Sequence, residues 1–161
     1  MKTFNEHEIN LATLEAHIRD SGLVPYKVDP DGIWLRTERG IGFRIAIIEV
    51  RKFVQLITYL PLRRDASLED KRELARLLNE GVFLPTFTID QDGDLAITYA
   101  MNYTAGLVAG NLIAIVHRFG SMLEYVVEAF NADGLIQFGA AAPVPAAADT
   151  ECRPASSRLV H

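Results

Sequence analysis

One stretch, residues 87–130, restricts the fold more than any other, because a hairpin pattern passes directly into a long helical one. Polar and apolar residues alternate through residues 86–89 and again through residues 95–99, which is the period of a half-buried strand. The intervening Asp92-Gly93 is suited to the positive φ values of a two-residue hairpin turn. From Leu107 onward the apolar period lengthens to about 3.6 residues. The stretch therefore predicts a β-hairpin followed by one long helix.

The long helix carries more apolar residues than a helix wet on one side needs. Its main stripe consists of Val108, Leu112, Ile115, Phe119, Met122 and Val126. A second set beside the stripe consists of Ile113, Val116, Leu123, Val127 and Phe130. Either the sheet wraps around the helix or a second subunit covers it. We expect core packing together with a homodimer contact at Val116, Phe119 and Leu123, since two-fold dimers are the commonest soluble oligomers.

The chain before this stretch predicts two further helices. The first is expected over residues 6–21, with Asn5 and Glu8 as a capping box and Gly22 as its stop. The second is expected over residues 68–80, capped by Ser67. Its inward-facing residues are predicted to be Leu74, Leu77 and Leu78, and its solvated ones Lys71, Arg72, Glu73 and Arg76.

Four strands are predicted between these helices, at residues 24–28, 33–37, 42–48 and 53–60. The resulting order α-β-β-β-β-α-β-β-α indicates an α+β fold, an antiparallel sheet of about six strands packed with three helices. Residues 1–135 are expected to form one domain. Alanine and proline dominate the chain beyond it, so residues 136–161 are predicted to be a flexible tail.

Composition limits the class of partner and the compartment. The 161 residues are 49% hydrophobic, which suits one soluble domain with its own core. A net charge of −5 disfavours nucleic acid, whose phosphates need clustered Lys and Arg. Cys152 is the single cysteine, so a disulfide framework is excluded and a cytoplasmic location is expected. No apolar run approaches the roughly 20 residues of a membrane span, and the first residues do not resemble a signal peptide.

The acidic turn at residues 90–94 is the nearest approach to a metal motif. An EF-hand loop needs Gly at its sixth position and Glu at its twelfth. Counting from Asp90, Gly93 is fourth and Met101 is twelfth, so a hairpin turn is the better interpretation.

No linear motif indicates catalysis or a cofactor. The four histidines have no metal-type spacing with one another, and His117 is expected to be interfacial or half-buried. Ser121 lacks the second glycine of an esterase elbow, and Cys152 lacks a setting that would lower its pKa. Gly40-Ile41-Gly42 joins two strands, so it fails the test for a dinucleotide loop. We therefore assign no catalytic, cofactor-binding or metal-binding residue.

The first sheet is locally basic in an acidic protein. Its cations are Arg36, Arg39, Arg44, Arg51 and Lys52. One interpretation is a solvated face whose charges protect a sheet edge. The other is a docking face for an acidic partner, formed by Trp34, Arg36, Arg44 and Lys52, although a lone Trp in a small sheet is more often in the core.

Order and spacing of these elements resemble the YbjN-type bacterial sensory transduction regulators, whose fold is similar to that of class I type III secretion chaperones. The segments that carry the resemblance are Gly22-Leu23-Val24-Pro25-Tyr26-Lys27-Val28-Asp29, Asp31-Gly32, Leu77-Leu78-Asn79 and residues 90–97. The resemblance implies a non-enzymatic, dimerising α+β module that binds another protein. The Ala/Pro tail and the segment Gly81-Val82-Phe83-Leu84-Pro85 depart from the family pattern.

Two functions follow as hypotheses. The first is a protein-binding or chaperone-like regulator, for which we expect an exposed apolar patch rimmed by Arg36, Arg44 and Lys52. The alternative is a small-molecule-sensing module or an unrecognised enzyme, for which we expect a pocket lined by convergent polar groups.

Overall fold

The computed structural model describes residues 2–138, which form one six-stranded antiparallel sheet, a two-stranded sheet and three α-helices. The six-stranded sheet has the order β2-β3-β4-β5-β7-β6. Its strands are β2 (Lys27–Asp29), β3 (Gly32–Arg36), β4 (Gly42–Ile48), β5 (Phe53–Leu60), β6 (Thr86–Ile89) and β7 (Leu95–Asn102). The predicted α+β class and the predicted element order are confirmed.

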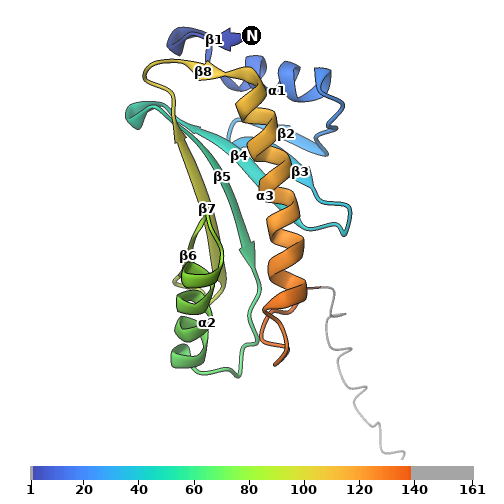
Figure 1. Cartoon of the computed structure of the whole chain (residues 1–161), viewed down its shortest axis with the longest axis vertical. Helices are drawn as coiled ribbons and strands as arrows, with labels where there is room; N and C mark the ends of the chain where they lie inside the picture. Colours follow the sequence, from blue (N-terminus) through green and yellow to red (C-terminus); the bar gives the residue numbers. More distant parts are fainter. Residues whose placement is uncertain (1, 139–161) are drawn as a thin grey trace, which may run out of the picture.

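Helix α3 runs along one face of this sheet, with α1 beside its N-terminal end and α2 beside β6 (Figure 1). The helices are α1 (Leu11–Asp20), α2 (Leu68–Gly81) and α3 (Ala109–Ala129). Short 3-10 turns occur at η1 (Glu6–Glu8) and η2 (Glu49–Arg51), and β1 (Thr3–Phe4) pairs with β8 (Leu107–Val108). His17 on α1 lies 3.0 Å from the carbonyl oxygen of Ala109, where α3 begins.

One face of α3 is buried completely by this chain's own sheet. The ring of Phe119 on α3 meets the ring of Phe43 on β4 edge-on, with 5.5 Å between the two ring centroids. Val116, Phe119 and Leu123 are 2%, 4% and 0% exposed, respectively. The homodimer contact that we expected at these three residues is therefore wrong, because their side chains are already enclosed in the core.

The sheet is buried on the face toward α3 and open on the other. Successive residues of a strand point to opposite faces. In β3, Ile33 and Leu35 are buried while Trp34 and Arg36 lie on the open face, and β5 continues the alternation. No helix of the described residues packs over this open face (Figure 1).

Two local predictions differ from the structure at turns. The first helix starts at Leu11, where the Asn10 side chain accepts from the Thr13 amide, and the predicted Asn5–Glu8 box caps only a 3-10 turn. The hairpin between β6 and β7 has a five-residue loop rather than a two-residue turn, because the Asp90 carboxylate accepts the backbone N–H groups of Asp92 and Asp94.

Two side chains of α2 lie opposite to their predicted positions. Lys71 is only 6% exposed, and its ammonium donates to the Gly93 carbonyl oxygen at 3.0 Å. Leu77, predicted to face inward, is exposed instead. The first turn of α2 therefore packs across the β6–β7 loop, which the helical period alone could not indicate.

The domain includes the first residues of the predicted tail. Ile136 is buried and bridges Leu62, and the Gln137 amide donates to the Pro61 carbonyl oxygen at 2.8 Å. The rest of the predicted tail, from residue 139 onward, lies outside the described residues.

Asn79 on α2 closes the free edge of the sheet at β6. Its side-chain amide donates to the Phe87 carbonyl oxygen at 2.9 Å and accepts the Phe87 N–H at 3.0 Å. These are the two bonds that a further antiparallel strand would make. The edge is therefore satisfied by a side chain instead of being left open to another chain.

We expect Asn79→Ala to lower the free energy of unfolding by about 1–3 kcal/mol, because both backbone groups of Phe87 lose their partner. Asn79→Asp keeps the acceptor for the Phe87 N–H and removes the donor to the Phe87 carbonyl oxygen, so its free energy of unfolding should fall by less. Urea denaturation at neutral pH measures both. Equal stability of Asn79→Ala and the unaltered protein would contradict this role.

Candidate functional site

A cationic–aromatic cluster, formed by Tyr26, Lys27, Trp34, Arg36 and Arg44, occupies the open sheet face at β2–β4. Trp34 pairs across the sheet with Lys27 on one side and Arg44 on the other. Their charged ends lie 5.2 and 5.3 Å from the indole centroid, and the guanidinium of Arg36 lies 4.2 Å from the Tyr26 ring. These distances are within cation–π range.

Arg36 and Arg44 carry the uncompensated charge of this cluster. Lys27 forms an ion pair with Asp29, which raises the pKa of Lys27 and lowers that of Asp29. No ion pair to Arg36 or Arg44 occurs within residues 2–138. The cluster therefore presents a net positive surface on a chain whose net charge is −5.

Two buried donors of this cluster make no hydrogen bond within the described part of the chain. They are the Arg44 Nε–H and the Trp34 Nε1–H. After Lys27 and the Asp31 N–H, the indole makes the smallest contribution to the lowered pKa of Asp29, and it finds no acceptor at hydrogen-bonding distance. Each buried donor without an acceptor has a cost of about 1–3 kcal/mol.

Lys52 does not belong to this surface, so the predicted four-residue face is only partly assembled. Lys52 caps η2 with a left-handed φ of 59° and forms an ion pair with Glu6 at 3.0 Å. Its ammonium also lies 5.9 Å from the Tyr103 ring. The structure thus brings Trp34, Arg36 and Arg44 together and places Lys52 against the N-terminal segment.

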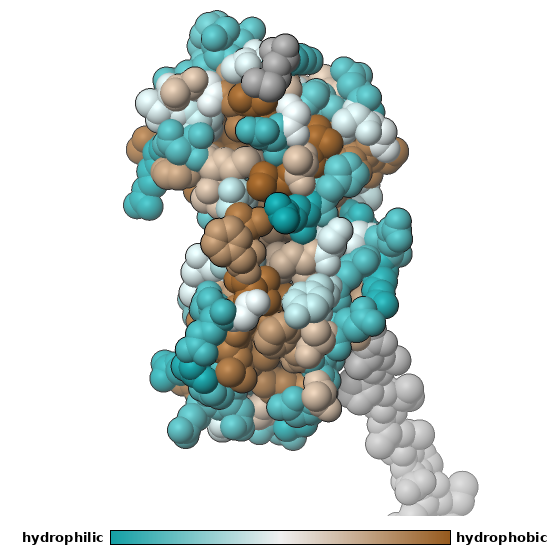
Figure 2. Space-filling view, in the orientation of Figure 1, coloured by the Kyte–Doolittle hydropathy of each residue, from teal (hydrophilic) through white to brown (hydrophobic). Residues whose placement is uncertain are grey.

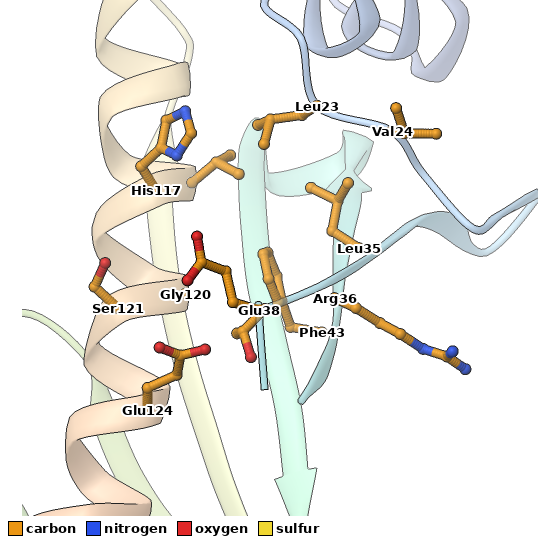
Figure 3. A pocket seen from close by; sticks show the side chains of 12 residues that line it. Leu23, Val24, Leu35, Arg36, Glu38, Phe43, His117, Gly120, Ser121 and Glu124 are labelled. Carbon is orange, nitrogen blue, oxygen red and sulfur yellow. The ribbon is translucent and has the colours of Figure 1, made fainter. Parts of the chain in front are cut away.

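A second feature is a cavity of about 330 Å³ between α3 and the β3–β4 hairpin, which we call the hairpin–helix pocket (Figure 3). Buried apolar side chains form its floor: Leu35, Phe43 and Val116. Polar side chains form its rim: Thr37, Glu38, His117, Ser121 and Glu124. Figure 3 shows the guanidinium of Arg36 pointing away from the pocket.

Glu124 fixes the hairpin to the helix at this pocket. Its carboxylate accepts the Arg39 N–H at 3.0 Å. This bond, helped by the Thr37 hydroxyl, lowers the pKa of Glu124. The guanidinium of Arg39 reaches past it and pairs with Glu128 at 3.3 Å. The loop is therefore held at a set distance from α3.

The third feature lies on the other side of α3, between α3 and α2, where Figure 2 shows a band of apolar residues. We call it the interhelix groove. Two adjoining hollows share Tyr99 and Ile115 in its walls. The apolar side chains that line the groove include Phe83, Leu84, Tyr99, Met101, Ile115 and Met122. Leu77 and Phe130 line a separate hollow between α2 and the end of α3.

The segment between α2 and β6 is strained where it borders this groove. Leu84 has a φ of 106°, a region that side-chain-bearing residues rarely adopt, at a cost of about 1–3 kcal/mol. Phe83 beside it is 90% exposed. An ordered loop that holds a phenylalanine in solvent is typical of a contact surface.

Several residues of these sites belong to no linear chemical motif, so the sequence prediction did not include them. His117, Gly120, Ser121 and Glu124 recur at helical spacing, so a polar stripe beside the buried stripe of α3 was visible in the sequence. Glu38 gave no such signal, because only the β3–β4 pairing brings it to α3.

Residues 2–138 contain neither a metal-binding cluster nor a membrane-spanning helix. No group of three or more His, Cys, Asp or Glu side chains could hold a metal ion there. No helix in that part of the chain is long and apolar enough to cross a membrane.

Comparison with protein families gives one match that spans most of the chain. A family model described as "YbjN: Putative bacterial sensory transduction regulator" matches residues 10–132. A search of curated proteins found no match.

Solved structures give matches over the same region. The crystal structure of YbjN from E. coli, described as "a putative transcription regulator", matches with a TM-score of 0.64 and 16% identity, covering 80% of this chain and 96% of that chain. A chain of the HopA1–SchA chaperone–effector complex matches with a TM-score of 0.52 and 16% identity, over 74% and 91% of the two chains. A chain of the ExsC–ExsE complex matches with a TM-score of 0.52 and 15% identity, over 71% and 88%. These likenesses confirm the predicted chaperone-like fold.

We expect Glu124→Gln to lower the urea midpoint at pH 7, because the neutral amide is a weaker acceptor for the Arg39 N–H. The lowered pKa of Glu124 means that its ionised form adds stability above pH 4.5 and that this stability is lost as the pH falls through the folded-state pKa. The difference between the two proteins should therefore close in acid. Glu49→Gln, at an exposed carboxylate away from α3, is the matched control and should leave the midpoint unchanged. A gap that persists in acid would contradict the assignment.

Proposed function

Because the chain belongs to the YbjN family, described as "putative bacterial sensory transduction regulators", we propose that it is a non-enzymatic regulator that acts by binding another protein. The cationic–aromatic cluster is the observation that carries this proposal. The chaperone–effector complex among its structural relatives supports a protein partner for this fold. We place its action in the cytoplasm, since Cys152 is the single cysteine.

The partner that fits the cluster is an acidic, extended protein segment. Arg36 and Arg44 supply two guanidinium charges that no acidic side chain of residues 2–138 pairs with. A guanidinium forms bidentate bonds to a carboxylate, and an aromatic ring beside it adds contact area. Electrostatic attraction to such a surface raises the association rate and weakens with salt.

The enzyme alternative has less support in the geometry. Nucleophilic catalysis needs a nucleophile in hydrogen-bonding reach of a base. Ser121 and His117 border the same pocket from one helix, but no hydrogen bond joins them in the part of the chain described. The hairpin–helix pocket instead gives support to the other alternative, a module that also senses a small molecule.

We expect the double variant Arg36→Glu and Arg44→Glu to lose at least tenfold in partner affinity, because both uncompensated charges are reversed. A photo-crosslinking amino acid placed at Tyr59, an exposed residue on the same open face, identifies the protein segment that binds in the native host. Calorimetry with a synthetic peptide of that segment then gives the affinity. Arg51→Glu with Arg72→Glu reverses the same number of exposed charges elsewhere and should leave the affinity unchanged. Equal losses in the two double variants, or a basic segment as the partner, would reject the docking face.

We further propose that the protein is a homodimer and that two copies meet through the interhelix groove. We propose this surface as the dimer contact in place of Val116, Phe119 and Leu123, which are buried in the core. Phe83 is held in solvent by a strained loop, and Met122 and Ile115 of α3 leave apolar area beside it. A two-fold axis would place each exposed Phe83 against the groove of the other copy.

We expect the full chain to elute with twice its 17.9 kDa mass in light scattering coupled to gel filtration. Phe83→Asp should raise the dimer dissociation constant at least tenfold, because a carboxylate would be desolvated in the interface. Val50→Asp, a fully exposed apolar residue on the β4–β5 connection, is the matched control and should remain dimeric. A monomeric unaltered protein at high concentration would refute the dimer.

A further inference from the structure

The hairpin–helix pocket combines an apolar floor with a rim of hydrogen-bond acceptors. Phe43 and Leu35 close its base, and Gly120 leaves room on the helix side, where a Cβ would lie 3.6 Å from Thr37 and 3.9 Å from Phe43. The volume of about 330 Å³ is in the range of small-molecule sites. A bound group would therefore have an apolar body of a few carbon atoms.

The charges around the pocket determine the sign of the group it can take. The carboxylates of Glu38 and Glu124 lie on its rim, with the imidazole of His117 and the hydroxyl of Ser121 beside them (Figure 3). The two nearby cations are directed elsewhere. Arg36 stacks on Tyr26, and the guanidinium of Arg39 pairs with Glu128.

The two carboxylates remain available to a ligand. Glu124 accepts the Arg39 N–H, and this bond and the Thr37 hydroxyl favour its ionised form. Within residues 2–138 it forms no ion pair, so its charge remains available to a cation. Within residues 2–138, Glu38 is bound by no hydrogen-bond donor or cation, and its side chain is exposed at the mouth. An anion would be repelled here, and a neutral group would leave both charges uncompensated.

We propose that the hairpin–helix pocket binds a small organic cation, an ammonium or guanidinium group on an apolar body, with Glu38 and Glu124 as its counter-ions and the Phe43 floor as its apolar contact. The site is separate from the cationic–aromatic cluster, which lies on the opposite face of the sheet. The proposed cation binding in the pocket does not depend on whether the cationic–aromatic cluster binds a protein.

The direct test titrates the full-length protein with phenethylamine and with 2-phenylethanol, followed by ¹H–¹⁵N NMR. Phenethylamine should saturate with shifts centred on Thr37, Glu38, Gly120 and Ser121, and the uncharged alcohol should bind at least tenfold more weakly. The double variant Glu38→Gln and Glu124→Gln should lose at least tenfold in affinity for the amine. Glu49→Gln with Glu69→Gln neutralises two exposed carboxylates away from the pocket and should keep the affinity. Equal binding of amine and alcohol, or shifts centred elsewhere, would overturn the proposal.

A second pair of variants tests the cavity rather than its charge. Gly120→Leu should fill the pocket and abolish amine binding. Gly110→Leu, where an added side chain meets open space on the same helix, should retain it. Thermal unfolding identifies a variant that fails to fold, and binding by a folded Gly120→Leu protein would also overturn the site.

The source of the cation is resolved by comparing cadaverine with a capped lysine, N-acetyl-lysine-methylamide. Tighter binding of the free diamine supports a small-molecule effector, and tighter binding of the capped residue supports a lysine side chain of a bound protein. Failure of both, together with failure of phenethylamine, would reject the pocket as a cation site without bearing on the docking face.

Discussion

The packing of α3 against one face of the sheet is the constraint on which the rest of the structure depends. Six strands spaced about 4.8 Å apart are roughly 24 Å across, whereas a helix with its side chains is about 10 Å wide. One helix therefore covers only the middle of the sheet. α1 covers one end and α2 the other (Figure 1). A hollow remains on each side of α3. The hairpin–helix pocket is one of these hollows, and the interhelix groove is the other.

The same constraint explains what the sequence could predict. Periods of two and 3.6 residues are local properties, and the boundaries of β4 and β5 follow from them closely. Asp-Gly turns at Gly32 and Gly93 were also visible, since both glycines take positive φ. Which neighbour covers a given apolar residue is not a local property. The excess of apolar residues on α3 was visible in the sequence, but not what each of them contacts. Val116 and Leu123 meet the sheet, whereas Ile115 and Met122 border the groove.

Polar side chains were hardest to place from the sequence because their roles depend on backbone groups distant in the chain. Lys71 is buried because the Gly93 carbonyl oxygen receives its ammonium, and Asn79 takes the place of a neighbouring strand at Phe87. Neither contact has a signature in spacing or composition. Lys52 shows that closeness along the chain is not closeness in space. It follows Arg44 by eight residues, but it lies past the far end of β4, away from the cationic–aromatic cluster, and pairs with Glu6.

The β3–β4 hairpin links the two faces of the sheet. Arg36 at the end of β3 contributes to the open-face cluster, Glu38 two residues later borders the pocket, and Arg39 is fixed to α3 by Glu124. Ligands on the two faces would therefore share one short, hydrogen-bonded loop. If a group in the pocket altered the bond between Glu124 and the Arg39 N–H, it would shift the segment that carries Arg36, and linkage requires the reverse effect to be equal. A sheet with both faces covered could not connect two binding events in this way, so the open face and the incomplete helical cover are parts of one arrangement.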